Sequence, residues 1–127
     1  MEKIIVAGFG GQGVLSLGQL LTYAAMYENQ YATWLPSYGP EMRGGTANCS
    51  VVIDAVKPVA SPIIAVADTL IAMNKPSLDK FQMNVCKDGL IIINSSLIND
   101  ECANTEARAV YVDANRIGIH GWSYGGY

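Results

Sequence analysis

The chain has 127 residues, of which 50% are hydrophobic and 15% are charged, and its formal net charge at pH 7 is -3. This length suits one domain with its own core, and the low share of charged residues indicates apolar surface that a partner covers. The few Lys and Arg residues form no basic stripe, so the composition argues against nucleic acid as a partner.

No apolar run reaches the roughly 20 residues of a membrane span, and the first residues lack the basic segment and cleavage site of a signal peptide. We therefore expect a cytoplasmic protein with no membrane partner. Three cysteines, Cys49, Cys86 and Cys102, lie far apart in the sequence. Their number and spacing fit neither a disulfide framework nor a metal site, so we expect three small apolar residues and no metal or iron–sulfur cluster held by this chain alone.

The first apolar run, residues 4–7, leads directly into the segment Gly8-Phe9-Gly10-Gly11-Gln12-Gly13. This order predicts a strand, a tight turn and a helix start, which is the context in which G-x-G-x-x-G has physical meaning. We expect Gly8 and Gly10 to allow the turn, and Gly13 to let the helix pack closely on the strand. An anion could bind at the positive end of that helix, although a tight connection between strand and helix needs no ligand.

Dinucleotide-binding folds offer an Asp or Glu about 20 residues after these glycines, at the end of the second strand, to hold the ribose. We predict the second strand at residues 31–35, and it is followed by Pro36-Ser37-Tyr38. Glu28 precedes that strand and is therefore on the wrong side. A free-standing nucleotide-binding module remains an alternative, although the acidic residue that would hold the ribose is missing from the expected position.

Residues 14–27 carry leucines and alanines at helical spacing, and Gly18 among them indicates a close approach to the sheet. The segment 36–45 contains two prolines and three glycines, which predict a loop. Further strands are predicted at residues 46–53, 69–73, 90–94 and 109–113, with a helix opening at Pro76, a turn at Asp88-Gly89 and an ambiguous stretch at 63–66. Apolar strands that alternate with helical segments predict an α/β fold: a three-layer αβα sandwich with a mostly parallel sheet and a Rossmann-like first βα unit.

Four motifs follow one another along the chain: G-F-G-G-Q-G-V at 8–14, S-Y-G-P-E-M-R-G-G at 37–45, Ser61-Pro62, and N-K-P-S-L at 74–78. In this order they resemble the gamma subunit of 2-oxoacid:ferredoxin oxidoreductases. The glycine turn combined with E-x-R-G-G is a more specific signature than either part alone. The tyrosine-containing segment Ser37-Tyr38-Gly39 resembles the 2-oxoglutarate and branched-chain 2-oxoacid branches of the family more than the pyruvate branch. The resemblance is interpreted as a shortened gamma domain over 1–117, followed by a tail, 118–127, that does not match the family.

The resemblance implies that this chain is one subunit of an anaerobic enzyme that decarboxylates a 2-oxoacid, reduces ferredoxin and forms an acyl-coenzyme A. Thiamine diphosphate with Mg and iron–sulfur clusters would be held mainly by the alpha and beta subunits and a ferredoxin-like delta subunit. We expect the isolated chain to be inactive, to contain no catalytic residue and to contribute to subunit assembly.

The glycine turn and one loop arginine are expected to face coenzyme A or a partner subunit: Gly10, Gly11, Gln12, Gly13 and Arg43. Arg43 is suited to binding a phosphate or carboxylate through two hydrogen bonds, with Glu41 orienting its guanidinium group. In the alternative interpretation, Glu41 and Arg43 pair with each other and only shape the loop.

Two polar features lie near the end of the chain. Asp113 and Asn115 are interpreted as helix-start residues, with a role as ligands of a polar group as the alternative. The segment 121–125 matches G-x-S-x-G and resembles the nucleophile elbow of prolyl-oligopeptidase-type serine hydrolases. His120 precedes Ser123, so a triad in the order that this elbow requires cannot be built from these residues. A serine hydrolase is therefore a second alternative, for which the acid and the histidine expected after Ser123 are missing from this sequence.

Overall fold

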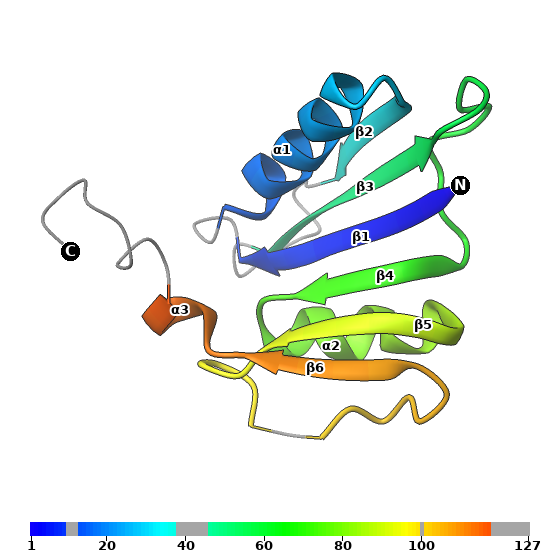
Figure 1. Ribbon diagram of the computed structural model, residues 1–127. Helices are drawn as coiled ribbons and strands as arrows, with labels where there is room; N and C mark the ends of the chain where they lie inside the picture. The colour runs from blue at the N-terminus through cyan, green and yellow to red at the C-terminus, as the bar shows by residue number, and fades with distance from the viewer. Residues whose placement is uncertain (10–12, 38–45, 100, 118–127) are drawn as a thin grey trace, which may run out of the picture.

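The computed structural model describes residues 1–9, 13–37, 46–99 and 101–117. Within them, six strands form one sheet in the order β2-β3-β1-β4-β5-β6 (Figure 1). The strands are β1 (Glu2–Phe9), β2 (Tyr31–Ser37), β3 (Thr46–Asp54), β4 (Ala67–Ala72), β5 (Val85–Asn94) and β6 (Arg108–Val112). The helices of the same residues are α1 (Val14–Tyr27), α2 (Lys75–Phe81) and the short α3 (Ala114–Ile117), and a 3-10 turn, η2, covers Gln82–Asn84.

All described strands except β3 run in one direction. β1, β4, β5 and β6 pair in parallel, whereas β3 pairs antiparallel with both β1 and β2. A parallel connection needs about a dozen residues or more, and only residues 38–45 separate β2 from β3, so the chain returns in the opposite direction. The mostly parallel α/β sheet is confirmed, with one reversed strand that was not predicted.

In the described part of the chain, α1 and α2 lie on opposite faces of the sheet, and each face has its own core. The alternation of side chains along β1 directs Val6 to one face and Ile5 to the other. α1 packs on the first face, where its Val14 meets the buried Val51 of β3. α2 packs on the second face around Leu78, together with buried residues of β4 and β5. The three-layer αβα arrangement is therefore confirmed (Figure 1).

Two glycines of the first βα unit have different roles. A Cβ atom at Gly18 would overlap Cys49 Sγ and lie 2.9 Å from Trp34 Nε1, so Gly18 allows the close approach of α1 to the sheet that the sequence predicts. Gly13 has a φ of 74° and nothing within 4 Å of its would-be Cβ. Gly13 therefore provides a left-handed turn and not close packing, which corrects the role predicted for it.

Three other predictions at strand ends were wrong. Gly8 belongs to β1, where it pairs with Ala47, and does not form part of the turn. Pro36 belongs to β2, and this is possible because β2 is an edge strand. Asp88 and Gly89 lie inside β5, where Asp88 has a φ of 63° next to a register shift between β4 and β5. The Asp-Gly pair thus makes an irregularity within a strand.

The ambiguous stretch 63–66 forms neither helix nor strand, and it leads into β4. No helix among the described residues has the length and apolar character needed to cross a membrane.

Candidate functional site

The candidate site lies where β1 and β4 end. These strands are parallel neighbours, yet α1 follows β1 on one face of the sheet and α2 follows β4 on the other. In open α/β sheets, ligands bind outside the carboxyl ends of two such strands, at a topological switch point. Figure 1 shows the carboxyl ends of β1, β4, β5 and β6 along one edge of the sheet, and we call this the carboxyl edge.

Gly13 forms one side of the switch point. It caps α1 with φ 74° and ψ 21°, and as a glycine it has no side chain that could accept a hydrogen bond from the helix. Leu17 N donates to Gly13 O at 2.9 Å, so helical hydrogen bonding starts here. Since the first turn contains no acidic residue, no carboxylate of that turn opposes an anion at the positive end of α1.

The remaining predicted site residues, Gly10, Gly11, Gln12 and Arg43, lie outside the described residues, as do Glu41, His120 and Ser123. The roles expected for them, including the hydrolase motif at 121–125, therefore stay predictions.

Asn74 forms the other side of the switch point, directly after β4. The neighbouring Met73 N donates to Ala7 O at 2.8 Å and joins this segment to β1. Asn74 is only 1% exposed, and its Oδ1 accepts a hydrogen bond of 2.9 Å from Ser77 N at the start of α2. Its Nδ2 is buried and has no hydrogen-bond partner in the described part of the chain. Leaving such a donor unpaired costs about 1–3 kcal/mol.

Asn94, at the end of β5, ties three strand ends together. Its Nδ2 donates to Met73 O at 3.2 Å and to Asn115 Oδ1 at 3.1 Å. Its Oδ1 accepts from Ser96 N at 3.1 Å and from Ala114 N at 3.2 Å. Because every polar atom of this side chain has a protein partner, Asn94 holds the carboxyl edge rigid. This role of Asn94 was not predicted from the sequence.

Asp113 and Asn115 belong to the same network. Ser96 Oγ bonds Asp113 Oδ1 and accepts from Asn115 N at 3.1 Å. The helix α3 begins at Ala114, directly after Asp113, so the prediction of a helix start is confirmed. The side chains also brace the loop after β5.

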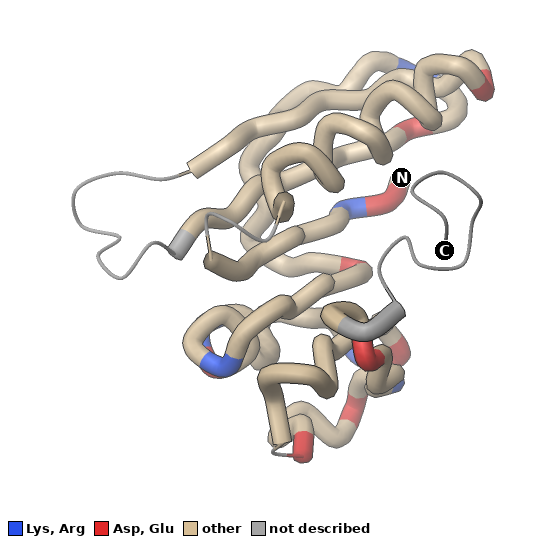
Figure 2. Tube along the Cα trace, turned by 90° about the vertical axis from the view of Figure 1, so that its left-hand side faces the viewer, with Lys and Arg blue, Asp and Glu red and all other residues tan. Residues whose placement is uncertain are grey.

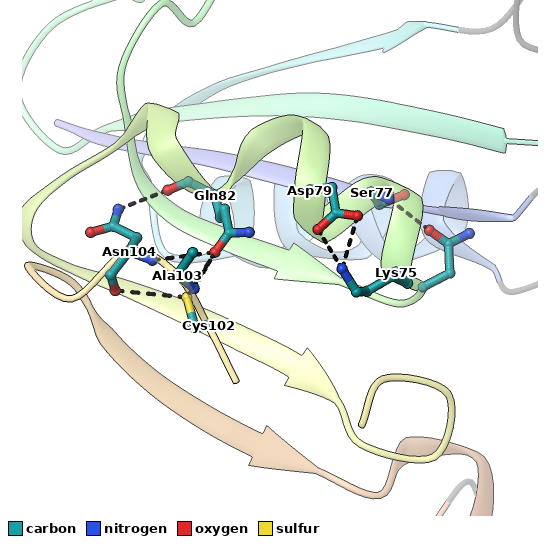
Figure 3. A network of polar contacts seen from close by, with 8 residues as sticks. Lys75, Ser77, Asp79, Gln82, Cys102, Ala103 and Asn104 are labelled. Carbon is teal, nitrogen blue, oxygen red and sulfur yellow. Dashed lines mark hydrogen bonds and ion pairs between the residues drawn. The ribbon is translucent and has the colours of Figure 1, made fainter. Parts of the chain in front are cut away.

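A second polar cluster lies at the opposite edge of the sheet, between η2 and the segment that precedes β6 (Figure 3). Gln82 Oε1 accepts from Ala103 N at 2.8 Å and from Cys102 Sγ at 3.3 Å. Asn104 Nδ2 donates to Gln82 O at 2.7 Å, and Asn104 Oδ1 accepts from Glu106 N at 3.0 Å. These polar atoms satisfy one another, which is the arrangement of a structural brace. A cavity of about 630 Å³ adjoins this cluster at Cys102 and Asn104.

The three thiols lie in three different places. Cys49 is fully buried between α1 and β3, where burial raises the pKa of its thiol. Burial and the neighbouring Asp68 carboxylate raise the pKa of Cys86, and Cys102 contacts Gln82. Within the described ranges, no three His, Cys, Asp or Glu side chains gather in a metal-binding arrangement.

The sheet order argues against the dinucleotide-binding alternative. In that fold the acidic residue at the end of the second strand reaches the ribose because the second strand lies beside the first. Here β3 separates β2 from β1, and β2 ends at Ser37. The described part of the chain therefore has neither the acidic residue nor the adjacent second strand that hold the ribose in dinucleotide-binding folds.

Residues 3–120 match the family model for pyruvate ferredoxin/flavodoxin oxidoreductase. The chain is 48% identical over 94 residues to the ketoisovalerate oxidoreductase subunit VorA of Methanothermobacter thermautotrophicus. It is 33% identical over 101 residues to the 2-oxoglutarate synthase subunit KorC of Methanocaldococcus jannaschii. These alignments cover 74% and 79% of this chain, but 20% of VorA and 54% of KorC.

Among solved structures, the gamma subunit of a keto/oxoacid ferredoxin oxidoreductase from Geobacter sulfurreducens PCA has a similar fold. The two structures align with a TM-score of 0.75 and 25% sequence identity. The alignment covers 93% of this chain and 68% of that one.

Proposed function

The chain belongs to the pyruvate ferredoxin/flavodoxin oxidoreductase family, and on that premise we propose that it acts as the gamma subunit of a 2-oxoacid:ferredoxin oxidoreductase. The family match over residues 3–120 carries the proposal. It is supported by a fold that follows a gamma subunit along 93% of this chain. The complex works in the cytoplasm of an anaerobic organism.

The assembled enzyme oxidises a 2-oxoacid to an acyl-coenzyme A with loss of CO2 and passes the electrons to ferredoxin. Thiamine diphosphate with Mg and iron–sulfur clusters supply this chemistry, and alpha, beta and delta subunits hold them. The separate positions of Cys49, Cys86 and Cys102 support a location of the clusters outside this chain. The substrate is 2-oxoglutarate or a branched-chain 2-oxoacid, and the higher identity to VorA than to KorC supports assaying ketoisovalerate first.

This chain contributes assembly and a contact to coenzyme A at the switch point. Gly13 caps the positive end of α1, which suits an anionic oxygen. The sequence motifs extend this proposal to Gly10, Gly11, Gln12 and Arg43, which lie outside the described residues. Arg43 is proposed to bind a phosphate of coenzyme A or a carboxylate of the partner subunit.

The test is recovery of activity with the tagged chain. The chain is expressed in its own source under anaerobic conditions, purified with whatever it retains, and assayed for viologen reduction driven by a panel of 2-oxoacids with and without coenzyme A. We expect thiamine-binding companion subunits and coenzyme A-dependent activity. Recovery of the chain alone, without activity, would contradict the proposal.

The Arg43→Ala variant separates the two roles of the surface. If Arg43 binds coenzyme A, the KM for coenzyme A of the assembled enzyme rises about tenfold. An unchanged KM together with lost assembly assigns Arg43 to the subunit interface instead.

A further inference from the structure

The second half of α1 exposes large apolar side chains, whereas Ser16 and Gln19 are exposed polar residues nearer its start. Leu20, Tyr23, Met26 and Tyr27 are 64%, 56%, 56% and 88% exposed. Because Leu20, Tyr23 and Tyr27 are spaced three and four residues apart, they lie along one line of the helix. Tyr23, Met26 and Tyr27 also line a groove of about 310 Å³. We call these four residues the α1 patch.

α1 carries no charged side chain along its 14 residues, and Figure 2 shows its tube without blue or red along that length. A helix that faces water normally has charged or polar residues on its outer side. α2, on the opposite face of the sheet, follows this rule: Lys75 and Asp79 form an ion pair of 2.7 Å, and Lys80 lies over the Phe81 ring. The exposed apolar residues in the second half of α1, with no charge beside them on the helix, therefore fit a surface that another protein covers.

We propose that the α1 patch docks onto a larger companion subunit of the oxidoreductase. The contacting surface of that subunit is apolar and carries no charge, because a charged group placed there would lose its hydration without gaining a partner on α1. This inference rests on the proposed function, and it assigns the interface to a specific face of the fold.

The α1 patch occupies one side of a 14-residue helix, which is about 21 Å long. A stable interface buries about 800 Å² on each partner. The α1 patch therefore supplies part of such an interface, and the partner also contacts residues beside it.

The relatives support the same occupant. In VorA, the part that matches this chain is 20% of the polypeptide, so the same sequence unit is linked covalently to a much longer protein. A lipid surface is a poorer fit, because helices that bind at the membrane surface flank their apolar side with Lys and Arg, and α1 has neither.

The test uses the tagged chain co-expressed with the other subunits of the oxidoreductase from its own source. In the Tyr23→Lys/Tyr27→Lys double variant, two charges enter the α1 patch at exposed positions. We expect the amount of co-purified companion subunit to fall by about tenfold or more. Tyr23→Phe/Tyr27→Phe retains the apolar rings and stays within about twofold of the parent chain.

Met83→Lys is the matched control, since Met83 is 68% exposed and lies in η2 next to α2. It should retain the companion subunit within about twofold. Thermal unfolding of each purified chain verifies that the α1 variants are folded, with Tm values within about 3 °C of the parent.

The outcomes separate the inference from the function. If companion subunits bind the parent chain and the double Lys variant equally, the inference is overturned and the proposed function stands. A parent chain that retains no companion subunit overturns both. If the isolated parent chain sediments as a dimer and the double Lys variant sediments as a monomer, the α1 patch contacts a second copy of the chain and the inference is overturned. Binding of the parent to vesicles of phosphatidylcholine and phosphatidylglycerol, lost in the same variant, would also overturn it.

Discussion

The two main helices lie on opposite faces of one sheet and differ on both of their sides. α2 is anchored to the sheet by a large side chain, Leu78, which is 1% exposed, and it presents the Lys75–Asp79 ion pair outward. α1 approaches the sheet closely at Gly18, where a side chain would overlap Cys49 and Trp34. Its outer side exposes Leu20, Tyr23, Met26 and Tyr27. The inner side of each helix thus determines how the helix packs on the sheet, whereas its outer side determines whether water or another protein covers it.

The largest expected effect on stability is at the anchor of α2. Leu78→Ala removes a fully buried side chain and leaves a cavity, so the free energy of unfolding should fall by about 2–5 kcal/mol. Leu20→Ala makes the same chemical change on the outer side of α1 and should alter it by less than about 0.5 kcal/mol in the isolated chain. Urea unfolding of the two variants measures the difference, and equal losses would refute the contrast between anchor and patch.

At Gly18, where α1 approaches the sheet closely, added side-chain volume should lower the stability of the chain. Gly18→Ala places a Cβ against Cys49 Sγ and Trp34 Nε1. It should destabilise the chain by about 1–3 kcal/mol, despite the better helix propensity of Ala. Combining it with Cys49→Ala, which makes room for the new methyl group, should cost less than the sum of the two single variants. Additive losses in this double-mutant cycle would show that the contact does not limit the approach of α1.

The start of α2 depends on its cap. Asn74 Oδ1 accepts a hydrogen bond from Ser77 N, so Asn74→Ala should lower the free energy of unfolding by about 1 kcal/mol. Asn74→Ser keeps a capping oxygen, and it should recover part of this loss. If both variants unfold alike, capping is not the main contribution of Asn74 to the isolated chain.

The smallest expected effect is at the outer side of α2. Lys75 and Asp79 are 41% and 53% exposed, and an exposed pair four residues apart on a helix contributes about 0.3–0.5 kcal/mol. Asp79→Asn should therefore shift the urea midpoint only slightly, and less so in 1 M salt. A loss of several times this size would mean that the outer side of α2 also supports the fold.

The element order could be predicted from sequence because apolar spacing is a local signal. The predicted helix 14–27 has the same bounds as α1 (Val14–Tyr27), and the strands lie close to their predicted positions. The reversal of β3 was not predicted, because strand direction depends on the length of a connection and not on the apolar pattern. At Asp88-Gly89, a turn signal was correct about the backbone angle but wrong about the element, since the positive φ occurs inside β5.

The candidate site was predicted only in part. The glycine turn was found because its motif has a defined context, and Gly13 has the positive φ that such a turn requires. Asn74 and Asn94 were not assigned a role, because asparagines at strand ends normally indicate turns. The signal that could have found them is their position: each stands where a buried strand ends, and the ends of parallel strands converge at one edge of the sheet.

The most direct test of the account compares two methionines in the same molecule. Met26 lies in the α1 patch and Met83 lies next to α2, and both are more than half exposed in the isolated chain. Oxidation of each by dilute hydrogen peroxide, followed by mass spectrometry, is measured for the free chain and for the assembled oxidoreductase. We expect assembly to slow the oxidation of Met26 by about tenfold or more and to change that of Met83 by less than about twofold. Equal oxidation of Met26 in both states would contradict this expectation.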